Sequence, residues 1–332
     1  MQVKTPTKYI HSRAAAIMLM IVAVCAAALM STVGSNDFLT AGHDSPITSF
    51  ASPDDWLTPG ATSFAVNVAA NIVIAFMLLV INRTFRLMQS ITWLFVGLFF
   101  FMQLAQPGVL TQFYSGSFLA LIVLPLTALL FSTYTNPDLT RSTYLIFFIL
   151  ALASLFLYNT LFYLPVFILG MVQMKTADMR NILAVLMGCV TPLWILLGLG
   201  ILSLESFRFP TAPVHLVPTM TDHSIYILTL ASTAFTGALG LILTFANFMK
   251  VVSYNSARRA FNGFITLLFI VTLILIAADH DNFTVYIPLL DALAAYQTGH
   301  FFATRRYRLS YIPYIVIILI YAAIAALPLL SL

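Results

Sequence analysis

Charged residues are scarce in this sequence of 332 residues: they make up 8% of it, while hydrophobic residues make up 61%. Soluble domains carry about a quarter charged residues, so the shortage excludes a soluble globular fold and predicts an integral membrane protein. The segments of about ten alternating residues that a membrane barrel needs are also lacking. Long apolar runs separated by short polar segments predict instead that helices cross the bilayer repeatedly.

Cysteines are few and nucleotide-binding motifs are absent from the sequence. The two cysteines, Cys25 and Cys189, fall inside apolar runs, which argues against a disulfide framework or a thiolate metal site. Without a P-loop or a dinucleotide fingerprint, neither ATP-driven chemistry nor a bound cofactor is expected. The His and Asp residues of the polar segments show no diagnostic metal-ligand spacing, so no metal site is predicted from His43, Asp44, His215, Asp222, His223, Asp279, His280 and Asp281.

The apolar runs predict an all-α polytopic transmembrane helical bundle that forms one domain over residues 1–332. About eleven helices are expected, at residues 14–33, 63–81, 90–106, 117–134, 143–157, 160–174, 181–204, 224–249, 262–278, 283–303 and 310–330. The run 144–174 would be about 46 Å long as one helix, against about 30 Å of hydrocarbon. We therefore expect a hairpin of two short helices that turns at residues 158–160, with the helices either kinked or packed behind others.

The basic residues sort to one side of this arrangement. Fourteen of the 15 Lys and Arg residues fall in loops on one side, whereas the opposite loops hold eight acidic residues and Arg208. The positive-inside rule then places the N-terminus in the cytoplasm and the C-terminus outside it, with the longest extracytoplasmic loops at 34–62 and 205–223. Topology and attraction to anionic lipid account for the basic loops, so membrane lipid, and not nucleic acid, is the expected partner.

The first apolar run, 14–33, follows three basic residues, as the apolar segment of a signal peptide does. It is rather long for such a segment, and no clean cleavage site follows it. We therefore expect a retained helix, with a cleaved signal as the alternative.

A polar stripe runs along the outer half of the second predicted helix. Ser63, Asn67 and Asn71 are four residues apart and share one face. Amides are unfavourable in lipid, so this face should point towards other helices or a wet cavity. Interhelical hydrogen bonding and a ligand-facing wall are the two alternatives. The side chains of Gln103, Gln106 and Gln112 extend the same polar region.

Asp291 lies within the predicted span 283–303, roughly 12 Å from its outer end. An aspartate at such a depth costs about 2.5 to 3.5 kcal/mol on insertion, which usually marks a function or a specific partner. It is either a neutral acid hydrogen-bonded to a neighbouring helix or a site for a proton, a cation or a substrate. Thr284, Pro288, Ala295 and Thr298 share its face as a seam suited to close packing, and His300 is expected at the membrane interface.

Three further candidates lie in the outer loops. Arg208 breaks the charge sorting and is a candidate ligand for a phosphate or carboxylate, with a salt bridge to Glu205 as the alternative. Asp54 and Asp55, in the segment SPDDW, are candidate catalytic carboxylates of an early outer loop. The Asp-His-Asp sequence at 279–281 is expected to be a solvated helix end.

The segments LLVINRTFRLMQSITW and SLFLYNTLFYLPVFILGMVQMKTADMRNILAVLMGCVTPLWILL, which fall within about residues 70–200, resemble an uncharacterised multi-pass inner-membrane protein family of Bacteroidota. That family has a Ser-Leu-Phe sequence in an apolar helix pair, then a basic turn, then a Gly-x-x-Thr-Pro helix. The corresponding residues here are Ser154 to Phe156, Arg180, Gly188, Thr191 and Pro192. The resemblance implies a cell inner-membrane location and no particular activity.

Three functions fit these observations. The first is cell-envelope assembly on the extracytoplasmic face, either handling a lipid-linked substrate or acting with other envelope proteins in an assembly or export machine. The second is an ion- or proton-coupled transporter that uses Asp291. The third is a structural membrane subunit without catalytic activity.

Overall fold

The computed structural model describes residues 12–33, 50–88, 93–106, 108–136, 139–201, 223–279, 282–304 and 311–330. Within these ranges the chain is all-helical and contains eleven α-helices, which confirms the predicted all-α fold and the predicted order of about eleven helices. The helices are α2 (Arg13–Val33), α3 (Ala61–Phe85), α4 (Leu94–Leu104), α5 (Ser115–Ser132), α6 (Thr140–Ser154), α7 (Leu164–Gln173), α8 (Met179–Gly198), α9 (His223–Val251), α10 (Ser256–Ala278), α11 (Phe283–Thr304) and α12 (Tyr311–Leu330). By length and composition, six of them can cross a membrane: α2, α3, α5, α8, α9 and α10.

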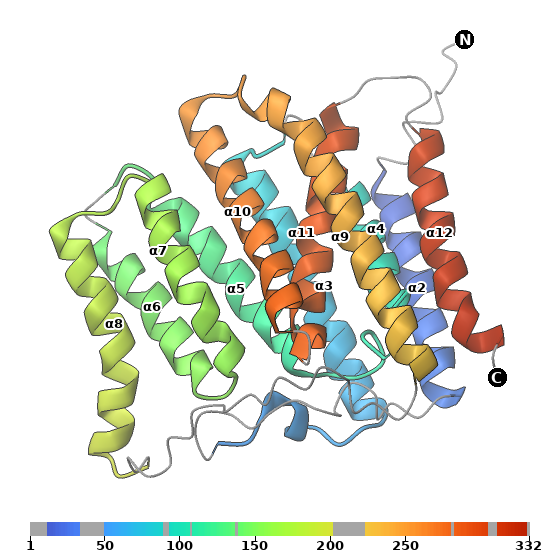
Figure 1. Cartoon of the computed structure of the whole chain (residues 1–332), viewed down its shortest axis with the longest axis horizontal. Coiled ribbons are helices and arrows are strands. Elements are labelled where there is room, and N and C mark those ends of the chain that lie inside the picture. Colours follow the sequence, from blue (N-terminus) through green and yellow to red (C-terminus); the bar gives the residue numbers. More distant parts are fainter. Residues whose placement is uncertain are drawn as a thin grey trace.

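The helices stand side by side in one bundle, with α6, α7 and α8 along one edge and α2 and α12 at the other (Figure 1). Two helices in the middle, α4 and α11, are buried on all faces: every residue of α4 and residues 283–300 of α11 are inaccessible to solvent or nearly so. The side chains of the predicted seam on α11, those of Thr284, Pro288, Ala295 and Thr298, are buried, and so are those on its other faces. Polar groups on α11 must consequently find their partners inside the protein.

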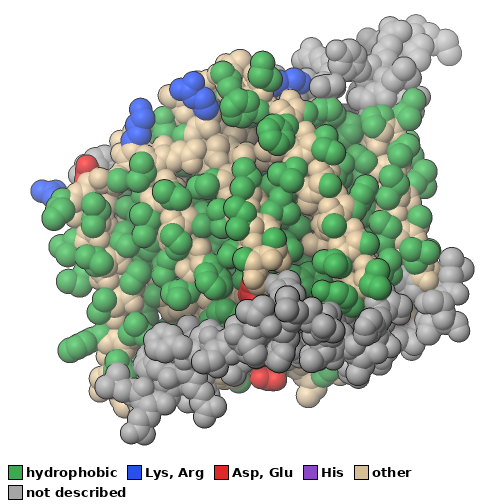
Figure 2. Space-filling model, in the orientation of Figure 1, with side chains coloured by type: hydrophobic (Ala, Val, Ile, Leu, Met, Phe, Trp, Pro, Cys, Tyr) green, Lys and Arg blue, Asp and Glu red, His purple; other side chains and the backbone are tan. Residues whose placement is uncertain are grey.

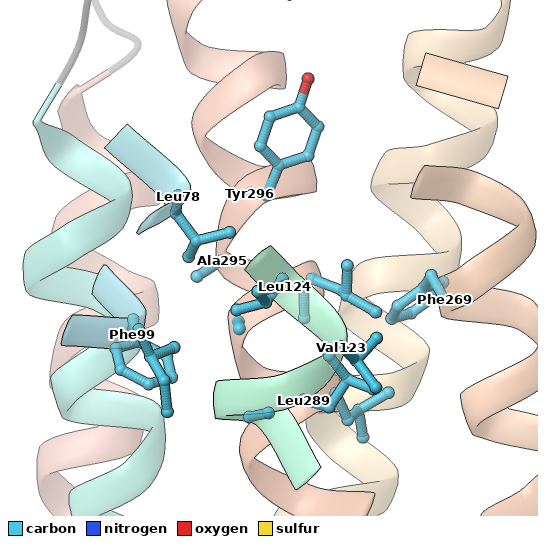
Figure 3. Packing of buried hydrophobic residues seen from close by; sticks show 14 of the residues in the cluster. Leu78, Phe99, Val123, Leu124, Phe269, Leu289, Ala295 and Tyr296 are labelled. Atoms are coloured by element: carbon cyan, nitrogen blue, oxygen red, sulfur yellow. The ribbon is translucent and has the colours of Figure 1, made fainter. Parts of the chain in front are cut away.

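A single large hydrophobic cluster extends from α2 to α12 around this central pair. Figure 3 shows part of it, with side chains from α3, α4, α5 and α10 meeting those of α11: Leu78, Phe99, Val123, Leu124, Phe269, Leu289, Ala295 and Tyr296. The cluster makes α11 the axis of the bundle.

Charged side chains gather at the two ends of the bundle, and hydrophobic side chains cover the surface between them (Figure 2). Lys and Arg lie along the end where α9 joins α10, with an acidic side chain beside them at the left, and further acidic side chains lie near the opposite end, close to the segment that precedes α3. The surface between them is rich in exposed Leu, Ile, Val, Phe and Met side chains. This pattern is the one expected of a helical bundle that spans a bilayer.

The long apolar run 144–174 folds as the predicted hairpin. Helix α6 ends at Ser154, a 3-10 helix, η2 (Tyr158–Tyr163), forms the tip, and α7 returns from Leu164. Helix α8 packs mainly on α6. The two helices approach closely at Gly188, where an added Cβ would lie 2.7 Å from the backbone oxygen of Tyr144.

Helix α4 is shorter than the predicted span 90–106. Its 11 residues extend about 16 Å, which is about half of the hydrocarbon thickness. The sequence Gln-Pro-Gly at 106–108 explains the end of the helix, because proline and glycine interrupt helices. Gly108 has a φ of +84°, and residues 109–114 continue as a largely irregular, buried segment before α5 begins. The end of α4 and this segment lie next to α11 and build the site described below.

Candidate functional site

Asp291 is the one buried acidic side chain in the described part of the chain, and no part of it reaches solvent. Two glutamines of the α4 end bind it. Gln103 donates from Nε2 to Oδ2 at 3.1 Å, and Gln106 donates from Nε2 to Oδ1 at 3.2 Å and to Oδ2 at 3.3 Å. The predicted partnership of Asp291 with a neighbouring helix is thus present, and Gln103 and Gln106 belong to the polar region as the sequence indicated.

The local fold explains why these two glutamines meet one carboxylate. Gln103 lies in the last turn of α4, and Gln106 follows three residues later, where residues of a helix share a face. The backbone keeps a helical turn beyond Leu104, since Ala105 N–H donates to Phe101 O and Gln106 N–H donates to Gln103 O. The C-terminal end of a helix carries partial negative charge. Asp291 therefore lies against a helix end that disfavours an anion and favours a neutral acid or a bound cation.

The charge balance of this cluster is incomplete. The hydrogen-bond partners of the Asp291 carboxylate in the described part of the chain are both neutral amides, and the amide oxygens Oε1 of Gln103 and Gln106 are buried without a hydrogen-bond partner. An ionised carboxylate inside a low-dielectric bundle costs several kcal/mol unless a positive group compensates it. The cluster thus offers a carboxylate and two unused amide oxygens, which is the chemistry that accepts a proton or a cation.

The polar stripe of α3 faces inwards, as predicted, and holds the segment that follows α4. Asn67 donates from Nδ2 to Val109 O at 2.9 Å and accepts at Oδ1 from the Ser117 hydroxyl at 2.7 Å. Asn71 donates from Nδ2 to the backbone oxygen of Asn67 at 3.0 Å, and the Oδ1 atom of Asn71 is buried without a partner. Ser63 completes the stripe by accepting a hydrogen bond from Phe113 N–H at 2.9 Å.

This hydrogen-bond network connects the polar stripe of α3 with Asp291, which the sequence did not link to each other. Val109 N–H donates to Gln106 O, and Val109 O accepts from Asn67. A chain of hydrogen bonds therefore runs from α3, through Val109, to Gln106, which binds Asp291. Movement of Val109 would change the contacts of both Asn67 and Gln106.

Two tyrosines that the sequence analysis did not single out lie near the cluster. Burial raises the pKa of Tyr114, in the connection before α5, well above its usual value, and the charges of Asp291 and Asp54 raise it further. Its phenol therefore stays protonated and donates to Thr284 O on α11 at 3.3 Å. Tyr321 of α12 is also within electrostatic reach of Asp291, and its hydroxyl lies 2.9 Å from the hydroxyl of Thr236 on α9. The sequence feature that could have identified Tyr321 is a tyrosine hydroxyl within an apolar run.

Asp54 belongs to the short 3-10 helix η1 (Pro53–Asp55), and its side chain contacts the first residue of α5. Its Oδ1 accepts from Ser115 N–H at 2.9 Å, and its Oδ2 accepts from the Ser115 hydroxyl and, at 3.1 Å, from the Ser52 hydroxyl. A carboxylate at a helix N-terminus satisfies backbone N–H groups and complements the helix dipole. Asp55 is exposed. The two candidate catalytic carboxylates thus have different environments, and that of Asp54 is one of helix capping.

The expectation of a solvated helix end at Asp279 is wrong. Asp279 Oδ2 accepts from Asn159 Nδ2 at 2.9 Å and from the hydroxyls of Tyr286 and Tyr158 at 3.1 and 3.3 Å, and Oδ1 accepts from Asn282 Nδ2 at 3.0 Å. The reason is tertiary: the tip of the α6–α7 hairpin lies against the turn between α10 and α11. His280 and Asp281 lie outside the described residues.

The interfacial position of His300 stays a prediction, but its side chain is not exposed. His300 is fully buried, its Nε2 lies 3.1 Å from the Tyr254 hydroxyl, and the Tyr296 ring stacks on it with centroids 6.3 Å apart. The end of α11 is enclosed by its neighbours, so a position near the end of a span does not imply exposure.

Arg208 and Glu205 lie outside the described residues, as do His43, Asp44, His215 and Asp222. Within the described ranges, no group of three or more His, Cys, Asp or Glu side chains is placed to hold a metal ion. Asp291, Asn67 and Asn71 are the candidate binding residues that the structure brings into one region.

Comparison of the chain with protein-family models, with curated proteins and with solved structures gave no match. Membership of the Bacteroidota family therefore stays a prediction, and the functional argument depends on the geometry of the site.

Proposed function

We propose that the chain is a multi-pass protein of the cell inner membrane, with the end of the bundle that carries Lys and Arg in the cytoplasm. The segregation of charge in Figure 2 and the six long apolar helices support this placement. In this orientation α2 begins on the cytoplasmic side, and α12 ends on the extracytoplasmic side.

Within the membrane, the proposed function is ion-coupled transport, with Asp291 as the site of a proton or a monovalent cation. The observation that carries the proposal is the buried Asp291 carboxylate, held by two neutral amides and by no described cationic group. Ionisable side chains within membrane bundles mark ion pathways and proton relays. Short or interrupted helices near such a site are typical of secondary transporters, and α4 is of this kind.

The envelope-assembly hypothesis has less support from the described residues. It depended on the acidic outer loops, on the polar stripe of α3 and on Arg208, which lies outside the described residues, with Asp54 and Asp55 as candidate catalytic carboxylates. The polar stripe of α3 is occupied by hydrogen bonds within the protein. The capping contacts of Asp54 with Ser115 account for the position of that carboxylate without any substrate. A lipid-linked substrate or an envelope partner remains compatible with ion coupling, since such machines need an energy source.

The test is electrical. Purified protein is reconstituted into proteoliposomes of phosphatidylethanolamine and phosphatidylglycerol, which are adsorbed on a solid-supported membrane, and charge displacement is recorded when the solution is exchanged. We expect a transient current on a pH jump or on a Na⁺ or K⁺ concentration jump, and its loss in Asp291→Asn. The exposed carboxylate of Asp55 provides the matched control, because Asp55→Asn removes a charge at the outer end and should keep the current. Absence of any current from the folded wild-type protein would refute ion coupling, and equal currents in Asp291→Asn would refute Asp291 as its site.

A further inference from the structure

Resting on the proposed ion-coupled function, we infer that the ion taken by Asp291 is a proton, and that Gln106 exchanges its role from hydrogen-bond donor to acceptor when the proton binds. Gln103 and Gln106 are then positioning residues for the protonated and ionised forms of one carboxyl group. The inference names the ion and assigns a movement to the end of α4.

The orientation of the amides distinguishes a proton from a metal cation. Both glutamines direct N–H groups at the carboxylate, while their carbonyl oxygens are buried and have no hydrogen-bond partner among the residues that the structure describes. A hard metal cation needs about six oxygen ligands directed at it, and N–H groups in the contact positions repel it. The described side chains of the cluster supply at most four oxygens, and both amides would have to turn. A proton needs only one amide to turn.

The protonation step balances without another reactant. A proton from water bonds to one carboxylate oxygen, so that Asp291 becomes a neutral acid with one O–H donor. The Gln106 amide makes a half-turn, and its Oε1, which had no partner, accepts that O–H. Gln103 continues to donate from Nε2 to the other oxygen of the acid. Release of the proton to water reverses each change. The cluster around Asp291 carries a net charge only while the Asp291 carboxyl group is ionised.

Gln106 is the residue expected to turn. Its amide is shared between the two carboxylate oxygens at 3.2 and 3.3 Å, whereas Gln103 makes a single bond at 3.1 Å from within regular helix. Gln106 also lies beyond the last residue of α4, and its backbone oxygen accepts from Val109 N–H in the irregular segment. That segment continues to Tyr114, which donates to Thr284 O on α11. Protonation is thereby connected to the contacts between α3, α5 and α11.

The groups facing Asp291 limit what else can titrate there. Gln103 and Gln106, at the end of α4, supply the two amides. Tyr114 lies in the connection before α5. Tyr321 belongs to α12, and its hydroxyl is hydrogen-bonded to that of Thr236 on α9. Asp54 acts on Tyr114 from the outer side. Burial raises the pKa of Tyr114 well above its usual value, so this phenol keeps its proton. The carboxyl group of Asp291 is the proton acceptor that we infer for this cluster.

The test combines currents with infrared spectroscopy on the reconstituted protein. The wild-type protein should give a transient current on a pH jump at constant Na⁺ and K⁺, and none on a Na⁺ or K⁺ jump at constant pH. Its infrared difference spectrum should contain a carboxylic-acid C=O band that titrates with pH, is absent in Asp291→Asn and persists in Asp55→Asn. The wild-type ion-jump comparison decides the identity of the ion even where the Asp291 variant fails to fold.

The exchange of roles is tested by the midpoint of that band. Gln103 donates in both states, and a donor favours the ionised form, so Gln103→Leu should raise the midpoint by about one pH unit, a tenfold change in proton affinity. Gln106 favours the ionised form as a donor and the neutral form as an acceptor, so Gln106→Leu should move the midpoint much less. An equal rise in both variants would show that Gln106 does not exchange roles. A Na⁺ or K⁺ current that requires Asp291 would refute the proton and leave ion coupling standing; absence of every current would refute both.

Discussion

Asn159, at the tip of the α6–α7 hairpin, donates a hydrogen bond of 2.9 Å to the carboxylate of Asp279, between α10 and α11. The two residues are 120 positions apart in the sequence. This bond, with those from Tyr158, Tyr286 and Asn282, fastens the outer edge helices to the centre of the bundle.

Removal of this carboxylate should destabilise the protein. Asp279→Ala removes the acceptor of the Tyr286 hydroxyl and one of the two acceptors of the Asn159 amide, whose other acceptor is the Tyr286 hydroxyl. An unsatisfied buried group costs about 1 to 3 kcal/mol. Thermal unfolding in detergent, followed by tryptophan fluorescence, should show a lower Tm for Asp279→Ala and for Asn159→Ala. The exposed Asp55→Ala is the control and should unfold as the wild type does. Unchanged unfolding of Asp279→Ala would restore the interpretation of a solvated helix end.

The contact between α6 and α8 should be sensitive to a single methyl group. An alanine at Gly188 would place its Cβ 2.7 Å from the backbone oxygen of Tyr144, which cannot move without the helix. Gly188→Ala should therefore cost about 1 to 3 kcal/mol through overpacking. Gly198→Ala, in the same helix, has no atom within 4 Å of the added carbon. Denaturation of the two variants side by side checks the prediction, and equal stabilities would show that α8 packs differently.

Asp54 should behave as a helix cap. Asp54→Ala removes the acceptor for Ser115 N–H and should lower stability by about 0.5 to 2 kcal/mol, while Asp54→Asn, which keeps a side-chain oxygen, should lower it less. The same unfolding measurement ranks the two variants. If Asp54→Asn unfolds like the wild type and an envelope phenotype is lost nonetheless, the carboxylate has a catalytic role and the transport proposal loses ground.

The orientation can be checked by thiol labelling. In a background with Cys25 and Cys189 replaced by serine, Ser45→Cys and His215→Cys should react with a membrane-impermeant reagent from the extracytoplasmic side, and Ser256→Cys should not. The physical reason is that 14 of the 15 basic residues fall on the side that contains residue 256. Reversed labelling would overturn the assignment of cytoplasmic and outer ends.

Local patterns determined much of the fold in advance. Run length against bilayer thickness predicted the helices and the hairpin at 158–160, since a helix must satisfy its own backbone in lipid. The inward orientation of Asn67 also followed from sequence, because an amide facing lipid is costly. The short length of α4 was harder to predict from the sequence. Proline and glycine at 107 and 108 indicated the end of a helix, but apolar residues lie on both sides of them.

Tertiary structure alone decided which polar groups meet. Gln103 and Asp291 are 188 residues apart, and nothing in either segment names the other as its partner. The burial of His300 and the four donors around Asp279 were equally invisible, because each depends on which helix lies alongside. The physical reason is that the core and the lipid-facing surface of a membrane bundle are both apolar, so the hydrophobic pattern that separates inside from outside in a soluble protein carries little of that information here. The sequence alone therefore determined the helices, their order and the place of Asp291 inside an apolar helix, and helix packing determined that the end of α4 binds it.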